Sequence, residues 1–357
     1  ELTTLCSWAL ISIYENERSL AAGMKALIMT GVGGIAFMLA LLLMYQQTHS
    51  FDYASLSALS DRRRGVVFGL LLVAAWAKAA QVPFWTWLPD AMEAPTPVSA
   101  YLHAAAMVKA GLFLIARTIF GSYIALTKTN ALYNLGFAQL HVTGHGLGVF
   151  MAAAAAVTML LGLYFYFFQD DLKRLLAYST ITHLGYVLFG FGLALAGVWV
   201  GLQAGLLHIA AHAAAKTTLF LSVGAIAWGS GTRLVSHLGG LVRKMPATAL
   251  AFWTGVFALT GIPPLAGFWS KFFLLAAAIK LGGFWGVLLL LVFVIEALLA
   301  LLWFLRVGQK AFFGEPTPVA EEAVEASPIM VAVLAVLAVL CLLAPLLAWP
   351  FLPPAPT

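Results

Sequence analysis

Three titratable residues stand at helical spacing inside one long apolar segment. The segment runs from Trp199 to Trp228 and carries His208, His212 and Lys216 at positions i, i+4 and i+8. On an α-helix these three side chains lie on one stripe. A lysine at the centre of a membrane-spanning helix costs about 2.5–3.5 kcal/mol on insertion scales, so it requires a partner from protein or water. Because neutral imidazole both accepts and donates a proton, the stripe predicts a hydrated track that passes protons.

A metal site is the alternative explanation for the two histidines. The spacing HxxxH can present two imidazoles to zinc, but the sequence has no HExxH motif and no third ligand nearby. Lys216, one turn further, would also repel a cation. A proton relay is therefore favoured, and we expect no metal and no cofactor. Cys6 and Cys341 form no CxxC or iron–sulfur cluster motif, and neither a dinucleotide-binding glycine motif nor a nucleophile–base signature is present.

Other ionisable residues lie in apolar segments and could join this track. Lys78 is followed by Pro83, which frees backbone groups of the preceding turn. It is either a lysine that snorkels to the interface or one that gains and loses a proton. His103 and Lys109 are six residues apart on the next span, so we expect them to serve different neighbours. A packing role explains His103 as well as a proton-relay role does. Lys109 lies deep in its span, which favours a role in proton transfer.

Three further candidates follow later in the chain. Lys173 comes after Asp170 and Asp171, and a cytoplasmic anchor between two spans explains it at least equally well. Lys271 follows the sequence GIPP near a predicted half-helix end, where transporters bind coupling ions. Glu296 is a lone carboxylate in an apolar run. It is either a proton-path residue or the polar partner of a neighbouring helix.

The elements that must position these residues are long apolar helices. Of 357 residues, 62% are hydrophobic and 9% are charged, against about 25% charged in soluble domains. The chain is therefore predicted to be an all-α polytopic membrane protein. Its net charge of +5 comes mostly from residues between spans and indicates no nucleic-acid partner. Ten spans are expected, at about 1–14, 24–46, 65–88, 97–120, 146–168, 176–197, 199–228, 246–264, 268–312 and 328–349.

Two segments need separate interpretation. The segment 268–312 is too long for one ordinary span, and Gly282-Gly283 would break it into two half-helices that together cross once. Residues 314–327 are polar and acidic and predict a solvated loop before the last span. The chain begins at Glu1 without an initiator methionine, and we expect it to be an excerpt of a longer protein. Glu1 would then be a carboxylate within a span, able to pair with a lysine.

Basic residues near the span ends predict an orientation, because cytoplasmic loops carry an excess of Lys and Arg. Nine such residues gather on one side, which is predicted to be cytoplasmic, and five on the other. The first side has Arg18, Lys25, Lys173, Arg174, Arg233, Arg243, Lys244, Arg306 and Lys310, and the second has Arg62, Arg63, Arg64, Arg117 and Lys128.

Several stretches together resemble one family. KAAQVPFWTWLPDAMEAPTPVSAYLHAAAMVKAGLFLIAR is similar to the hallmark of the proton-translocating antiporter-like membrane subunits. These occur in respiratory complex I, membrane-bound hydrogenases and Mrp-type cation/proton antiporters. DDLKRLLAYSTITHLGY, LLHIAAHAAAKTTLFLSVG and GIPPLAGFWSKF resemble later motifs in the same order. Within the group, MVKAG and GTRLVSHLGGLVRKMP look most like the large A-type subunit of Mrp antiporters and the distal antiporter-like subunit of complex I.

The resemblance implies an architecture of two inverted five-helix bundles, each with a broken helix, around a central hydrophilic axis. It also implies that several N-terminal helices are absent here. Residues 1–120 would be the remainder of the first bundle, and residues 121–313 the second bundle with its broken helix at 268–312. Residues 314–357 would form the polar loop and the last span.

The resemblance also implies roles for individual residues. Glu1 matches the family's key membrane glutamate, and Lys78 matches the lysine paired with it. His103 matches an axis histidine, and Lys173 matches the central lysine, which favours function over the loop interpretation. The HxxxHxxxK stripe matches the family's relay, and Lys271 matches the terminal lysine of the second channel.

Two positions depart from the family pattern. Phe272 follows the terminal lysine where relatives often have an acidic residue, so the partner of that lysine is not evident from the sequence. His183 stands where many relatives have glutamine.

The sequence therefore predicts one component of a multisubunit complex in the cell (inner) membrane that moves protons, by pumping or in exchange for Na⁺ or another monovalent cation. Its partners would be other membrane subunits and the lipid bilayer. In this hypothesis a Glu1–Lys78 ion pair opens and sends a proton along Lys173, His208, His212 and Lys216 toward Lys271. Two alternatives remain: a transport-inactive scaffold whose polar residues only pack helices, and the membrane subunit of a quinone-linked oxidoreductase.

Overall fold

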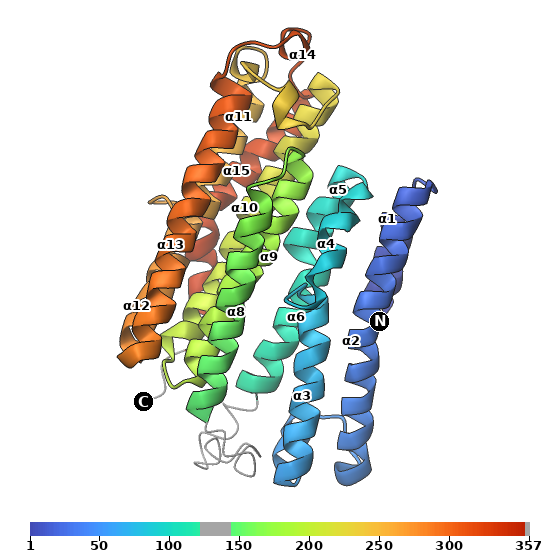
Figure 1. Cartoon of the computed structure of the whole chain (residues 1–357), viewed down its shortest axis with the longest axis vertical. Helices are drawn as coiled ribbons and strands as arrows, with labels where there is room; N and C mark the ends of the chain where they lie inside the picture. Colours follow the sequence, from blue (N-terminus) through green and yellow to red (C-terminus); the bar gives the residue numbers. More distant parts are fainter. Residues whose placement is uncertain (122–143, 354–357) are drawn as a thin grey trace.

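The computed structural model describes residues 1–121 and 144–353, and their regular structure is helical (Figure 1). Apart from helices, these residues form one isolated β-bridge, between Asp171 and Leu234. By length and composition, seven helices in this part of the chain could cross a membrane, and two shorter apolar helices accompany them. The all-α membrane fold is therefore confirmed, with ten spans as an approximate count.

The helices fall into two sequential groups, which lie side by side in Figure 1. The first group is α1 (Leu2–Ile11), α2 (Glu17–Thr48), α3 (Asp61–Lys78), α4 (Trp87–Asp90), α5 (Thr96–Ala100) and α6 (Met107–Ile115). The second group is α8 (Gly144–Tyr166), α9 (Leu172–Leu195), α10 (Val200–Ser230), α11 (Pro246–Thr260), α12 (Ala266–Leu281), α13 (Gly283–Gly308), α14 (Pro318–Glu321) and α15 (Pro328–Ala348). The division into inverted bundles stays a prediction, because residues 122–143 lie outside the described ranges.

Polar side chains define where several of the long helices begin. The carboxyl or hydroxyl oxygen of an N-cap residue accepts hydrogen bonds from the first free backbone N–H groups of a helix. Asn16 caps α2 in this way through its amide oxygen, Asp171 caps α9 and Ser327 caps α15. These caps define where the helices begin, because the apolar sequence within each helix contains no such signal.

One span is interrupted, and the interruption lies between α11 and α12. Gly261 ends α11 with a φ of +94°, and Pro263 and Pro264 follow, which have no N–H group to continue a helix. The chain resumes as α12 at Ala266. The break exposes the last carbonyl groups of α11 inside the bundle, where a side chain can use them.

The break expected at Gly282-Gly283 is instead a reversal of the chain. Both glycines have positive φ values, +66° and +59°, a backbone conformation that L side chains rarely adopt. Helix α13 packs back along α12, and Gly286 lies against the Ala278 carbonyl near the turn. With 26 residues, α13 is about 39 Å long and crosses a bilayer alone. The prediction that 268–312 crosses only once is therefore wrong, because paired glycines permit a hairpin as readily as a kink.

Helix α9 is the central element of the second group and is buried along nearly its whole length. It packs against α8 on one side and α10 on the other. Close approach to α8 depends on glycine: a Cβ on Gly192 would lie 2.5 Å from the backbone nitrogen of Ala152. Helix α10 in turn packs against α11, α12 and α15. A polar residue on the facing sides of α9 and α10 is consequently shielded from lipid.

The basic residues assigned to the predicted cytoplasmic side are partly connected by ion pairs. Asp90 Oδ2 lies 2.7 Å from Lys25 Nζ, and Asp90 Oδ1 lies 3.9 Å from Arg174 Nη2. Asp171 Oδ2 lies 2.5 Å from Arg233 Nε. Three residues that were grouped from sequence therefore lie at one end of the bundle. Lys128, assigned to the opposite side, is outside the described residues.

Candidate functional site

The α10 stripe is buried and faces the protein interior, as its spacing predicts. His208, His212 and Lys216 are each at most 1% exposed. Lys216 Nζ donates to the carbonyl oxygen of Leu176, at 2.8 Å, and to Ser179 Oγ, both on α9. A neutral carbonyl and a hydroxyl thus surround this ammonium group.

Lys109 reaches the same stripe from α6. Its Nζ lies 3.2 Å from the carbonyl oxygen of Ile209 and 3.0 Å from His212 Nδ1. When Lys109 is an ammonium group, which only donates hydrogen bonds, His212 Nδ1 is the acceptor of this contact. The other ring nitrogen, Nε2, is buried and has no hydrogen-bond partner among the described residues.

His183 on α9 joins the stripe at its other end. Its Nδ1 lies 3.0 Å from His208 Nε2, and the two rings are stacked with their centroids 5.2 Å apart. His208 Nδ1 lies 2.8 Å from Ser270 Oγ, which donates to the carbonyl oxygen of Gly267. His208 therefore donates from Nδ1 to Ser270 and accepts at Nε2 from His183. Sequence reasoning noted His183 only as a departure from a motif, because a single histidine in an apolar helix gives no signal of its partner.

Lys271 lies one turn into α12, at the interruption of the span. Its Nζ donates to the carbonyl oxygen of Thr260, the last residue of α11, at 3.0 Å. It also lies 4.9 Å from the centroid of the Tyr186 ring. The Tyr186 hydroxyl donates to Glu296 Oε2 on α13. Sequence reasoning missed Tyr186, which comes from α9, and the Thr260 carbonyl, which ends α11, because only the packing of these helices brings both to Lys271.

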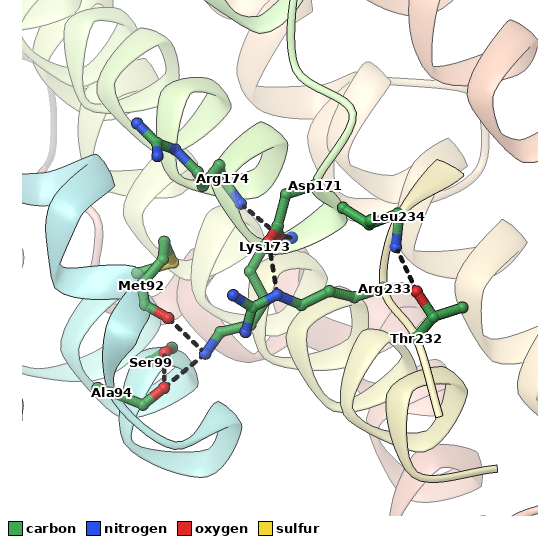
Figure 2. A network of polar contacts seen from close by, with 9 residues as sticks. All are labelled: Met92, Ala94, Ser99, Asp171, Lys173, Arg174, Thr232, Arg233 and Leu234. Carbon is green, nitrogen blue, oxygen red and sulfur yellow. Dashed lines mark hydrogen bonds and ion pairs between the residues drawn. The ribbon is translucent and has the colours of Figure 1, made fainter. Parts of the chain in front are cut away.

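Lys173 is 1% exposed and does not anchor the protein at the surface. Figure 2 shows its side chain directed at the segment that follows α4, where Nζ donates to the carbonyl oxygens of Met92, at 2.8 Å, and Ala94, at 2.5 Å. The neighbouring Asp171 does not hold this ammonium group. It caps α9 and pairs with Arg233 instead (Figure 2). The surface-anchor interpretation of Lys173 is therefore wrong.

Lys78 is the last residue of α3 and contacts α1. Its Nζ donates to Thr4 Oγ1, lies 3.4 Å from Thr3 Oγ1 and is 3.8 Å from Glu1 Oε1. The side chain of Lys78 is 12% exposed and that of Glu1 is 49% exposed. The two residues that the family resemblance pairs are thus within ion-pair distance.

His103 lies apart from these contacts. It is fully buried in the π-helical turn Tyr101–Ala105, and its ring centroid is 5.0 Å from that of Phe220. Neither ring nitrogen has a hydrogen-bond partner in the described part of the chain. Lys216 and Lys173 are the charged groups that act most strongly on it. His103 and Lys109 serve different neighbours, as their spacing predicts.

The contacts define an order along the site. Lys109, His212, His183, His208 and Ser270 follow one another, and Lys271 comes next in the chain. The expected order along α10 was the reverse, with Lys216 nearest to Lys271. Because α10 packs against α12 with His208 beside Ser270, it is His208 that meets the interrupted span. Among residues 1–121 and 144–353, no group of three His, Cys, Asp or Glu side chains is placed to hold a metal ion.

A bundle of apolar helices around a buried series of lysines and histidines, with an interrupted span beside it, defines a multi-pass membrane protein with an internal polar axis. The family described as "NADH:quinone oxidoreductase/Mrp antiporter, TM" matches residues 1–299. The chain belongs to this family, and it is a multi-pass protein of the cell membrane.

Individual relatives come from both branches of the family. The chain is 38% identical over 326 residues to the A/B subunit of a probable K⁺/H⁺ antiporter of Rhizobium meliloti, covering 88% of this chain and 30% of that protein. It is 36% identical over 288 residues to an NAD(P)H-quinone oxidoreductase subunit 5 of Paulinella chromatophora, covering 75% and 39% respectively. The chain thus spans about a third of the length of these relatives.

A solved structure shares the fold. The Mrp complex from Dietzia sp. DQ12-45-1b contains a chain that superposes with a TM-score of 0.79 at 32% sequence identity. The match covers 96% of this chain and 35% of that one. The helical arrangement described above is therefore shared with a chain of that Mrp complex.

Proposed function

We propose that this chain is a membrane-embedded proton-translocating subunit of a multisubunit energy-conserving complex, working by proton pumping or by cation/proton antiport. The observation that carries the proposal is the buried series of contacts from Lys109 through His212, His183 and His208 to Ser270. Buried ionisable groups inside membrane helices are costly and mark ion or proton pathways.

The hydrogen bonds of the series can be arranged so that a proton passes from Lys109 toward Ser270. A proton from the Lys109 ammonium group passes to His212 Nδ1, and His212 then releases a proton from Nε2. The His212 and His183 ring centroids are 5.7 Å apart, so water completes this step in the proposal. His183 donates to His208, and His208 donates to Ser270 beside Lys271. Each imidazole receives a proton on one nitrogen and releases one from the other.

Lys78, Lys173 and His103 extend the proposed pathway toward the first group of helices. The Glu1–Lys78 distance of 3.8 Å suits an ion pair that opens and closes during transport. Lys173 occupies a separate buried site at the α4 end, and His103 lies in the electrostatic field of Lys173 and Lys216. Protons cross the intervals between these groups through water in this proposal.

The transported ion and the parent complex belong to the proposal as well. One relative is named as part of a K⁺/H⁺ antiporter, and another as part of a quinone oxidoreductase. Other membrane subunits are the proposed partners, and H⁺ with Na⁺ or another monovalent cation the proposed cargo. Iron–sulfur and flavin proteins that co-purify with the chain would identify a redox-driven pump, whereas small hydrophobic partners alone would identify an antiporter.

The test is transport by the intact complex in proteoliposomes, measured as internal pH change after energisation or after addition of Na⁺ or K⁺. Lys78→Ala is expected to abolish transport and to leave assembly intact. The matched control is Lys280→Ala, an exposed lysine at the end of α12, which should transport normally. Unchanged transport in Lys78→Ala would refute the proposal. Reduced assembly with normal transport per assembled complex would support the scaffold alternative.

A further inference from the structure

The terminal lysine of the site has no carboxylate on its own helix. Phe272 follows Lys271 and is 52% exposed on the outer face of α12. The only hydrogen bond that Lys271 Nζ makes among the described residues is to the neutral carbonyl of Thr260. An ammonium group that is buried away from water is costly without an opposite charge nearby. A countercharge for Lys271 must therefore come from another element.

Glu296 on α13 is the carboxylate placed to supply that charge. It is 0% exposed, so it needs an opposite charge as much as Lys271 does. Each acts electrostatically on the other. No direct ion pair joins the two side chains in the described part of the chain, and both contact Tyr186: the Lys271 ammonium is 4.9 Å from the ring centroid, and the hydroxyl of the same ring donates to Glu296 Oε2.

Tyr186 couples the two charges through one aromatic ring. A cation over an aromatic face is attracted by the negative face of the ring. When the ring hydroxyl donates to a carboxylate, electron density shifts toward the ring, and neighbouring polar interactions strengthen one another. The anion at the hydroxyl of Tyr186 therefore favours the cation over its ring face. The ring contacts of Tyr186 with His183 and His208, at 5.0 Å and 5.2 Å, place this unit beside the histidine series.

One oxygen of the carboxylate remains available. Glu296 Oε1 is buried and has no hydrogen-bond partner in the described part of the chain, and the same holds for the hydroxyl of Tyr166 on α8. Three titratable side chains interact electrostatically with Glu296: Tyr166, Tyr186 and Lys271. An ionised carboxylate with an unpartnered buried oxygen is a ready proton acceptor.

We propose that Glu296 is the countercharge of Lys271, acting through the Tyr186 ring, and that it takes up the proton that Lys271 releases. This inference rests on the proposed proton-translocating function and specifies its terminal step. One N–H bond of the ammonium group breaks, and one O–H bond forms at Glu296 Oε1, with water carrying the proton between them. The unit carries +1 and −1 before the transfer and two neutral groups after it, so its net charge stays zero. Glu296 then serves as the proton donor that follows Lys271.

Infrared spectroscopy of the intact complex tests the charge coupling without requiring transport. Removing the cation in Lys271→Gln should leave Glu296 protonated, which gives the C=O band of a buried carboxylic acid. That band should be absent from the double variant Lys271→Gln/Glu296→Gln. If Lys271→Gln shows no such band, Glu296 remains ionised without the lysine, and the proposal is overturned.

Thermal unfolding of the same complexes gives a second, independent measurement. Each single substitution removes the countercharge of a buried group, which must then be neutralised at a cost in stability, whereas the double substitution removes both groups. The loss in midpoint temperature of the double variant should therefore be smaller than the sum of the two single losses. Glu296→Gln combined with Lys280→Gln is the control and should be additive. Additivity in the Lys271–Glu296 pair would overturn the inference.

Transport measurements then separate this step from the overall function. Glu296→Asp keeps a carboxylate and should retain more transport than Glu296→Gln. Tyr186→Phe keeps the ring face but removes the hydroxyl, so it should weaken the temperature coupling between Lys271 and Glu296. If Lys78→Ala transports normally while the pair remains coupled, the proposed function fails and the charge pair stands. If Lys78→Ala is inactive and Glu296→Gln transports at the wild-type rate, only the terminal step is refuted.

Discussion

Lys173→Arg is the substitution that best separates a proton carrier from a structural contact. Lys173 donates two hydrogen bonds to backbone carbonyls, those of Met92 and Ala94, and hydrogen bonds from a charged group contribute about 1.5–3 kcal/mol each. Arginine keeps the positive charge and has donors for both carbonyls, but its guanidinium group does not release a proton in proteins. The substitution therefore keeps the charge and the contacts and removes the proton chemistry.

The expected magnitudes follow from the burial of the site. Lys173 is 1% exposed, so the larger arginine side chain overpacks it at a cost of about 1–3 kcal/mol in unfolding free energy. Assembly should survive a change of that size. Transport should fall by about 100-fold or more, the lower limit of what a positioned proton donor or acceptor contributes. Lys173→Met removes the contacts as well, and it should lose both transport and some stability.

The assay is proton transport by the assembled complex, normalised to the amount of complex recovered and accompanied by its unfolding temperature. Lys25→Arg is the control at the same end of the bundle. The Lys25 side chain is 41% exposed in its ion pair with Asp90, and exposed pairs contribute about 0–1 kcal/mol. Wild-type transport by Lys173→Arg, together with loss in Lys173→Met, would mean that Lys173 only fastens α9 to the segment after α4.

Two further substitutions test other parts of the structure. His183→Gln keeps a donor and an acceptor next to His208 and should retain measurable transport, whereas His183→Phe should reduce it by about tenfold or more because the series is interrupted; equal activity of the two variants in proteoliposomes would contradict a relay through His183. Glu325→Ala removes a carboxylate that accepts from the backbone N–H groups of Ala247, at 2.8 Å, and Thr248, at 3.3 Å, at the start of α11. It should lower the unfolding free energy by about 0.5–2 kcal/mol, measured by thermal unfolding, with transport per complex unchanged.

The local sequence was sufficient to predict the position of a side chain where the geometry of a single helix decides it. The spacing of His208, His212 and Lys216 places them on one face of any α-helix, and the structure buries all three. Composition likewise predicted long apolar helices. The reversal at Gly282-Gly283 was not predictable in this way, because the same residues suit a kink and a hairpin. What decides between them is the packing of α13 along α12.

Side-chain contacts with segments distant in the sequence could not be predicted either. Lys173 looks like a loop residue beside two aspartates, and its burial depends on carbonyl groups about 80 positions earlier in the chain. Lys271 lacks an acidic neighbour in sequence, and the candidate carboxylate, Glu296, comes from the next helix through Tyr186. Sequence patterns report neighbours along a helix, whereas these contacts are made between helices.

The four lysines of the site that lie deepest in the bundle share one kind of acceptor, and that choice suits proton transfer. Each donates to a backbone carbonyl oxygen: Lys109 to Ile209, Lys173 to Met92 and Ala94, Lys216 to Leu176, and Lys271 to Thr260. A direct carboxylate partner would favour the charged ammonium form strongly. A neutral carbonyl accepts a hydrogen bond from the ammonium group and from the uncharged amine alike. These lysines can therefore lose and regain a proton without losing the contacts that position them.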